Sequence, residues 1–450
     1  RRVKDVIERI AGESGKLVRP VLPATHPFAY RNKMAVPAGL VKGKAALGCY
    51  RQGSHDIIPV SSCAIQKEEN NRLLQFARRC IEKYRISVYD EKTRKGSLRH
   101  VMGRVGDDGK VMVVLVTASK TLPEEKRWIE EIQKELPEAV SLWHNIQPKT
   151  GNTILGAKIR HLWGRETLTA SLCGLQFEVS PYSFFQVHKE QAEILYEKAL
   201  AYADLKGGET VIDAYCGTGT ISLCLAKKAK RVIGIEIVKP AIEDAKKNAK
   251  KNHMENTEFY AADAGKLMPQ LYRQGLVPDV IVMDPVRAGC SEEVLKAAAG
   301  MNPKRIVYVS CNPATFARDA KILKSEGYEI KEIQPVDMFP QTMHVETVAL
   351  LCRKDIDNHI EVKLELEEED ITKVESKGTY ENIKDYILDK YGLKVSMLYI
   401  AQIKRKCGLE LGENYNKSKK DNQVVPECPK EKEDAIMDTL KAFGMIVQEG

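Results

Sequence analysis

The chain has 450 residues, of which 43% are hydrophobic and 29% are charged, an ordinary composition for a folded protein of two or three domains. Its formal net charge of +8 favours a polyanionic partner without requiring one. No apolar run is long enough to span a bilayer and the first residues lack a secretory apolar core, so we expect a cytoplasmic location. The eleven cysteines are scattered and include no CxxC pair, which disfavours a closed zinc site built from this chain alone.

Residues 1–180 predict a mixed domain of strands and helices. The runs typical of strands and of amphipathic helices are 110–119, 168–180, 68–84 and 124–136. The stretch "HPFAYRNKMAVP" (26–37) mixes aromatic, basic and apolar side chains, which suits base stacking and phosphate contact. An ordinary solvated strand explains the same stretch equally well.

From 181 to 354 the sequence changes to a regular alternation of strands and helices. Five such units followed by a terminal pair of strands predict a mostly parallel sheet covered by helices. Residues 355–450 begin with a charge-rich break and continue as a small module of basic helices that includes "IKRK" (403–406). We expect this extension to add RNA affinity or to dock a protein.

A cofactor site is indicated by three features that follow successive strands. "DAYCGTGT" (213–220) joins a strand to a helix, and its glycines allow backbone N–H groups to approach a ligand closely. Glu236 ends the second strand, where a carboxylate accepts hydrogen bonds from ribose hydroxyls, and Asp263 follows the third, where it can meet an adenine amino group. This pattern is neither GxGxxG nor a phosphate loop and favours S-adenosylmethionine (SAM), with another nucleotide as the alternative.

A nucleophile is predicted at the end of the fifth strand, in "RIVYVSCNP", where Cys311 precedes a helix that begins near Pro313. An amine needs no thiol to be methylated, whereas carbon 5 of a pyrimidine does, because thiolate addition at carbon 6 makes carbon 5 nucleophilic. The carbon-5 proton must then leave, and Glu346 is the candidate base, with His344 nearby. We expect the helix N-terminus and Arg287 to lower the pKa of Cys311.

These residues resemble the RNA uracil-C5 methyltransferase family. "SFFQVH", "DAYCGTGT", "DPVRAG", "SCNP" and "MHVET" occur in the family's order and spacing over about residues 1–354. The resemblance implies a class I SAM-dependent methyltransferase with a Rossmann-like, mostly parallel seven-stranded sheet. It implies Cys311 as the nucleophile and Glu346 as the base. The SAM contacts that it implies are Gln186, Tyr215, Glu236 and Asp284, with Asp263 at a looser position.

The chain departs from the family pattern at several positions. Val286 stands where a second proline is usual, and His188 stands where asparagine is usual, which could alter how the base is held. Many members bind a four-iron cluster through three N-terminal cysteines and a later one, which Cys63 matches. Because the three earlier cysteines are absent, we expect an N-terminal segment to be missing; otherwise Cys63 is a packed, structural thiol.

The predicted function is therefore methylation of carbon 5 of a uridine in RNA, with 23S ribosomal RNA preferred to transfer RNA, by a monomer that does not bind a membrane. The first alternative is an RNA cytosine-C5 methyltransferase, which would carry a second cysteine after Asp284-Pro285; Val286 and Arg287 stand there instead. The second alternative is an RNA-binding protein in which SAM is incidental, which the pairing of Cys311 with Glu346 disfavours.

Overall fold

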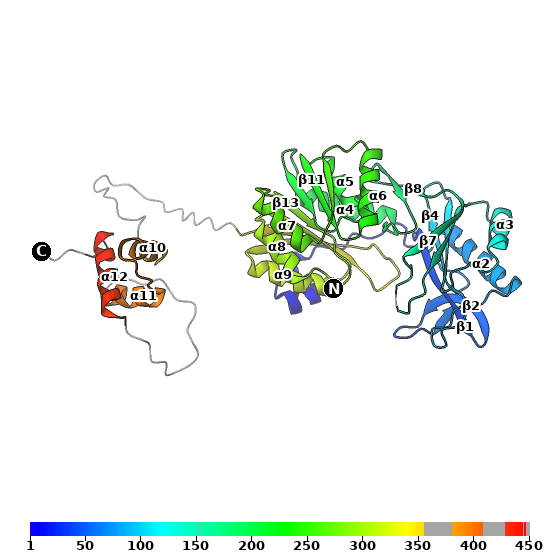
Figure 1. The fold of residues 1–450 in the computed structure, drawn as a ribbon, viewed down its shortest axis with the longest axis horizontal. Helices are drawn as coiled ribbons and strands as arrows, with labels where there is room; N and C mark the ends of the chain where they lie inside the picture. Colours follow the sequence, from blue (N-terminus) through cyan, green and yellow to red (C-terminus); the bar gives the residue numbers. More distant parts are fainter. Residues whose placement is uncertain (152, 355–379, 408–427, 444, 447–450) are drawn as a thin grey trace. The chain divides into compact units, whose positions relative to one another are not determined.

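The computed structural model describes residues 1–151, 153–354, 380–407, 428–443 and 445–446 (Figure 1). The chain divides into two units, Arg1–Asp357 and Asn358–Gly450. Within the described residues, the first unit contains two seven-stranded sheets and one separate pair of strands, and the second unit is helical.

The first sheet is largely antiparallel; only β5 and β6 pair in parallel. Its strands lie side by side in the order β3 (Ile57–Pro59), β2 (Lys44–Tyr50), β1 (Lys33–Val41), β4 (Leu98–Val105), β5 (Val111–Thr117), β6 (Ala139–Ile146) and β7 (Lys158–Gly164). Helices α2 (Glu68–Lys83) and α3 (Glu125–Glu135) cover one face. Phe76 and Trp128 from these helices share a buried core with Val36 and Val101 of the sheet. The opposite face of β1 and β4 carries no such helix among the described residues (Figure 1).

The second sheet agrees with the predicted seven-stranded, mostly parallel arrangement. Its strands lie in the order β12 (Thr257–Ala261), β11 (Arg231–Glu236), β10 (Thr210–Asp213), β13 (Val280–Met283), β14 (Arg305–Ser310), β16 (Glu346–Arg353) and β15 (Tyr328–Val336). The first five are parallel, and β16 runs antiparallel between β14 and β15. "VIVM" is apolar throughout, and "RIVYVS" is buried from Ile306 onward, because helices cover both faces of a parallel sheet.

The helices of the second sheet divide evenly between its faces. One face packs on α4 (Lys189–Ala203), α5 (Thr220–Ala226) and α6 (Lys239–Lys251). The other packs on α7 (Ala264–Arg273), α8 (Glu292–Gly300) and α9 (Pro313–Ser325). The chain builds the sheet outward from β10 through β11 to β12, and then returns to form β13 on the other side of β10. The order of the strands therefore reverses between β10 and β13. Ligands of open α/β sheets bind at the carboxyl ends of the strands at such a point.

Two segments that precede residue 180 contribute to the core of the second sheet. The first comprises α1 (Arg2–Val6), η1 (Ile7–Ala11) and η2 (Gly15–Leu17), from which Val3 and Ile7 pack with α9. The second is the strand pair β8 (Leu168–Leu172) and β9 (Leu175–Val179), whose apolar side chains pack with α4 and α6. The predicted boundary between the first two domains at residue 180 stays a prediction. The strands of the first sheet and the side chains of its core lie within residues 33–164.

The second unit contains α10 (Tyr380–Tyr391), α11 (Met397–Lys406) and α12 (Lys430–Ala442), so the described part of the extension is helical. Its small core includes Ile383, Ile387, Ile400, Ile436 and Leu440. The predicted charge-rich break after Lys354 lies outside the described residues. In the part of the chain that the structure describes, no helix combines the length and apolar character needed to cross a membrane.

Candidate active site

Polar side chains from five strands meet at one end of the second sheet, the end at which the parallel strands have their carboxyl ends. Asp213, Glu236, Asp284 and Cys311 stand at or just after the carboxyl ends of β10, β11, β13 and β14. Glu346 is the first residue of β16. Because β16 is antiparallel to its neighbour β14, its beginning lies at this same end of the sheet.

The register of β14 and β16 places the predicted nucleophile beside the predicted base. Ser310 pairs with Thr347 at the end of this ladder, and Thr347 Oγ1 donates to the Ser310 carbonyl over 3.3 Å. Cys311 follows the last residue of β14, and Glu346 precedes Thr347 on β16, so both lie just beyond the end of this ladder. The two side chains are close enough for the Glu346 charge to raise the pKa of Cys311. Glu346 is buried and Cys311 is half-buried.

Carboxylates dominate the electrostatics around Cys311. Burial raises the pKa of Glu346 to about 8, with a further contribution from the charge of Asp284. Burial and the charge of Asp213 raise the pKa of Asp284 to about 7. The pKa of Cys311 rises to about 11 through burial and the charges of Glu346 and Asp284. The expected lowering of the Cys311 pKa is therefore wrong, since Arg287 offsets only part of these effects.

The glycine turn after β10 is held by Asp213. Ser222 Oγ donates to Asp213 Oδ2 over 2.6 Å, and the Tyr215 backbone N–H donates to Oδ1 over 3.4 Å. Gly219 has a φ of +84°, and a Cβ there would lie 3.2 Å from the Ala245 side chain. The turn therefore requires glycine both for its left-handed backbone and for close packing against α6.

The remaining predicted cofactor residues have different surroundings. Glu236 accepts a hydrogen bond from the Val238 backbone N–H over 2.9 Å at the end of β11. Asp263 caps α7 by accepting from the Lys266 N–H over 3.2 Å, so its carboxylate already has a structural partner. Burial raises the pKa of Tyr215, and the nearby Asp263 charge adds to this effect. Gln186 is buried, and its backbone carbonyl accepts a hydrogen bond from Asn32 Nδ2 over 3.1 Å.

His344 faces cations rather than carboxylates. Its Nδ1 lies 3.3 Å from Arg287 Nη2. Burial lowers the pKa of His344, and the charges of Arg287, Arg2 and Arg31 lower it further. The site thus has a carboxylate beside Cys311 and an imidazole on the side where arginines converge.

The loop that leads into Glu346 is anchored by two residues from other parts of the chain, Tyr30 of the stretch 26–37 and His188, which stands where asparagine is usual in the family. Tyr30 donates to the Pro340 carbonyl over 3.0 Å, and His188 Nδ1 lies 3.1 Å from the Met338 carbonyl oxygen. The two rings stack with centroids 4.4 Å apart. Tyr30 is buried, so it positions this loop instead of offering an open stacking surface for RNA. Pattern alone could not distinguish these roles, because both use an aromatic ring beside cations.

A second anchor holds the loop that carries Arg287. Asp319 of α9 accepts from Tyr308 Oη over 2.5 Å and from the Cys290 N–H over 2.8 Å. Arg318 donates to the carbonyls of Ala288 and Cys290. The helix that follows Cys311 therefore positions Arg287. The sequence signal was an aspartate at a position of α9 that faces the core.

Cys63 is half-buried, and its backbone is fixed by the Asn71 side chain. The described residues contain no group of three or more His, Cys, Asp or Glu side chains that could hold a metal ion. The iron cluster implied by the resemblance stays a prediction, and no step of the chemistry is derived from it.

The order of the strands, the antiparallel β16 within the sheet and the glycine turn followed by Glu236 define a class I SAM-dependent methyltransferase. Residues 111–354 match the model of the tRNA (uracil-5-)-methyltransferase family, and the chain belongs to this family. It is an RNA methyltransferase that uses SAM.

Similar proteins cover most of the chain. An uncharacterized RNA methyltransferase of Bacillus cereus is 50% identical over 354 residues, which are 78% of this chain and 77% of that protein. A relative from Halalkalibacterium halodurans with the same description is 48% identical over 356 residues, 79% of this chain and 78% of its own. The crystal structure of Pyrococcus abyssi tRNA (uracil-54, C5)-methyltransferase with S-adenosyl-L-homocysteine is 30% identical, with a TM-score of 0.63 over 78% of this chain and 81% of that one.

Proposed function

We propose that this enzyme methylates carbon 5 of a uridine in RNA by covalent catalysis, with Cys311 as the nucleophile and Glu346 as the base. The observation that supports the proposal is the meeting of a thiol and a buried carboxylate at the ends of β14 and β16, near enough for the Glu346 charge to act on Cys311. A methyltransferase that acts on amines has no use for this pair.

The chain's residues account for each proton and bond of this reaction. The Cys311 thiol, which is half-buried, releases its proton to solvent, and Sγ bonds to carbon 6, which moves the electrons of the 5,6 double bond toward carbon 5. SAM, when bound, supplies the methyl group that carbon 5 takes. Glu346 then removes the carbon-5 proton; the electrons of that C–H bond re-form the double bond, and the Cys311 Sγ–carbon bond breaks.

The surrounding side chains support these steps. Arg287 stabilises the Cys311 thiolate, since it is the cation that acts to lower the pKa of that thiol. A Glu346 pKa raised to about 8 gives a base that is strong enough to remove a carbon-bound proton and still partly ionised near neutral pH. Gln186, Tyr215, Glu236 and Asp284 are proposed to contact SAM. Asp263 remains a weaker candidate because its carboxylate caps α7.

A cytosine-C5 methyltransferase remains the alternative to exclude. It would need a second reactive cysteine after Asp284-Pro285. The nearest one along the chain, Cys290, is buried, and burial raises its pKa to about 12, so it is a poor nucleophile. Mass spectrometry of the product nucleosides separates the two: we expect 5-methyluridine, and 5-methylcytidine would overturn the proposal.

The RNA itself is proposed only from the resemblance, which favours 23S ribosomal RNA. Mapping of methylated uridines in RNA from cells with and without this protein identifies the position. We expect one 5-methyluridine of ribosomal RNA to disappear, and the loss of one in transfer RNA would correct the substrate.

A further inference from the structure

On the face of the first sheet opposite α2 and α3, three pairs of residues lie directly across from each other on β1 and β4. Lys33 pairs with Arg104, Ala35 with Met102, and Pro37 with His100. Alternate residues of a strand share one face, so these pairs lie on the same side of the sheet. Pro37 is four residue steps beyond Lys33, which corresponds to about 13 Å along the strand.

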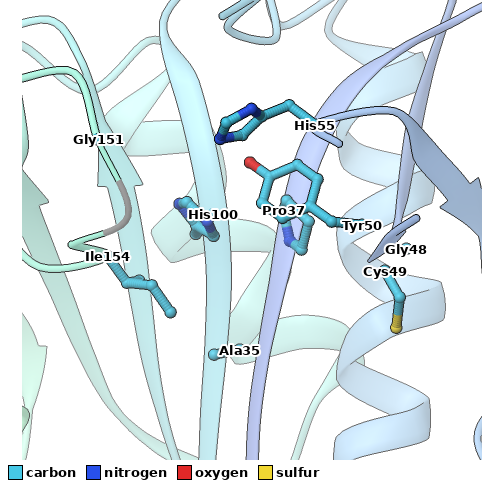
Figure 2. A pocket seen from close by; sticks show the side chains of 9 residues that line it. All are labelled: Ala35, Pro37, Gly48, Cys49, Tyr50, His55, His100, Gly151 and Ile154. Carbon is cyan, nitrogen blue, oxygen red and sulfur yellow. The ribbon is translucent and has the colours of Figure 1, made fainter. Parts of the chain in front are cut away.

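The Pro37–His100 pair lies in a pocket of about 320 Å³. Figure 2 shows the ring of Tyr50 between those of His55 and His100, with β1 beside them. The ring centroids of Tyr50 and His55 are 5.2 Å apart, and those of Tyr50 and His100 are 6.5 Å apart, both in edge-to-face arrangements. Ala35 also lines this pocket, so small and apolar side chains accompany the three aromatic rings.

His100 provides an unpartnered polar group in this pocket. It is 6% exposed, and its Nδ1 has no hydrogen-bond partner among the described residues. Burial and the neighbouring Arg99 charge lower the pKa of His100 to about 4, so the ring is neutral at pH 7. A neutral imidazole offers one donor and one acceptor, as the edge of a nucleobase does.

Arg31, Lys33 and Arg104 form a group of cations at the end of this face opposite to the pocket of His100. No carboxylate of the described residues forms an ion pair with Arg31, Lys33 or Arg104. Arg104 is buried and donates to the carbonyls of Pro181 and Ser183, and Arg31 Nε donates to the Lys33 carbonyl over 3.1 Å. Like charges directly opposite each other in a sheet are unfavourable, and an anion would relieve this repulsion. Consistent with this, burial and both arginines lower the pKa of Lys33 to about 7.

We propose that this face binds an unpaired nucleotide of the RNA substrate, with its base in the pocket of Tyr50, His55 and His100 and a neighbouring phosphate at Lys33 and Arg31. The exposed rings of Tyr50 and His55 suit single-stranded RNA, whose bases are free to stack. Arg31 lies near enough to His344 for its charge to lower the pKa of that imidazole, so the cationic end of this face is the end nearer the proposed active site. The inference rests on the proposed uridine methylation and adds a second recognition site to it.

Fluorescence anisotropy tests the pocket, using a short labelled RNA that spans the uridine methylated by the wild-type enzyme. Loss of one base–aromatic stack should weaken binding of Tyr50→Ala about ten- to a hundredfold, and Tyr50→Phe should restore it. His55→Ala, which changes an exposed side chain, should also weaken binding. The matched control is Tyr272→Ala, an exposed tyrosine on α7. If both Tyr50→Ala and His55→Ala bind the RNA with wild-type affinity, the proposal that this pocket binds an RNA base is overturned.

The proposed phosphate site at Lys33 and Arg31 is tested by measuring the salt dependence of RNA binding and the affinity for SAM. Lys33→Met should reduce the slope of log K against log salt by about 1 and leave SAM affinity unchanged. Lys126→Met, an exposed lysine on α3, is the control. A Lys33→Met variant that loses SAM affinity and keeps its RNA affinity would show that the anion is the cofactor's carboxylate, which overturns the assignment. If wild-type enzyme methylates no uridine, the proposed function fails; if it does and these variants match wild type, only this inference fails.

Discussion

The active-site end of the second sheet is rich in carboxylates, whereas the face of the first sheet opposite α2 and α3 carries cations at one end. Asp213, Asp284 and Glu346 gather at the active-site end, where burial and neighbouring carboxylate charges raise their pKa values. Lys33 and the buried Arg104 lie at the cationic end of that face, and no carboxylate among the described residues pairs with them. The carboxylates suit the sulfonium of SAM and proton removal, and the cations suit a phosphate backbone. Arg287 is the cation beside Cys311, where RNA must meet the carboxylate-rich site.

The largest expected effect comes from separating the two halves of the chemistry. Cys311→Ala should methylate no RNA and form no covalent adduct, because no carbon–sulfur bond can form. Glu346→Gln should slow turnover by about 10²–10⁴-fold and accumulate protein bonded to methylated RNA, because elimination lacks its base. Denaturing gels with labelled RNA and SAM measure both results. Methylation by Cys311→Ala would refute covalent catalysis, and normal turnover by Glu346→Gln would make His344 the next candidate.

The raised carboxylate pKa values predict the pH dependence. Glu346 acts as a base only when ionised, so kcat/KM for RNA should rise with pH through about 8. Cys311 acts in the same direction, since its thiolate fraction also grows with pH. Asp284→Asn removes a charge that raises both pKa values and should shift the rise toward lower pH at saturating SAM. A profile that is flat through pH 8 would contradict the assignment of Glu346.

Substitutions of the two candidate cofactor carboxylates, Glu236 and Asp263, should have different effects. Glu236→Ala should weaken SAM binding by about 1.5–3 kcal/mol, or about 10- to 150-fold, because charge-assisted hydrogen bonds to ribose are lost. Asp263→Ala should instead reduce the free energy of unfolding by about 0.5–2 kcal/mol, since it removes the cap of α7. Calorimetric titration and chemical denaturation measure the two quantities. Equal losses of SAM affinity would show that both residues contact the cofactor.

The smallest expected effect is that of the second unit on the active site. Removal of residues 355–450 should leave SAM affinity unchanged, because every proposed reacting group lies within Arg1–Asp357. RNA affinity should fall modestly, since the basic last turn of α11 adds electrostatic attraction. Calorimetry for SAM and anisotropy for RNA test this. A truncated chain that does not bind SAM would place the second unit in the catalytic core.

Local sequence was sufficient for the main elements of the catalytic half. Strand and helix periodicity predicted the parallel sheet, and the positions of Cys311, Glu236 and Asp284 at strand ends followed from the same pattern. These features depend on neighbouring residues along the chain, because a strand end and the turn after it are local. Whether each named residue performs its proposed role stays a prediction that the experiments above address.

Tertiary structure alone decided the electrostatics and the supports of the site. The pKa of Cys311 rises because Glu346 and Asp284 converge on it from other strands, which strand patterns do not reveal. Tyr30 and His188 stack under the loop that precedes Glu346, although more than 150 residues separate them along the chain. The pairing of Lys33 with Arg104 required the β1–β4 register. Burial and the distances between charges depend on which distant segments pack together, so only the folded chain determines them.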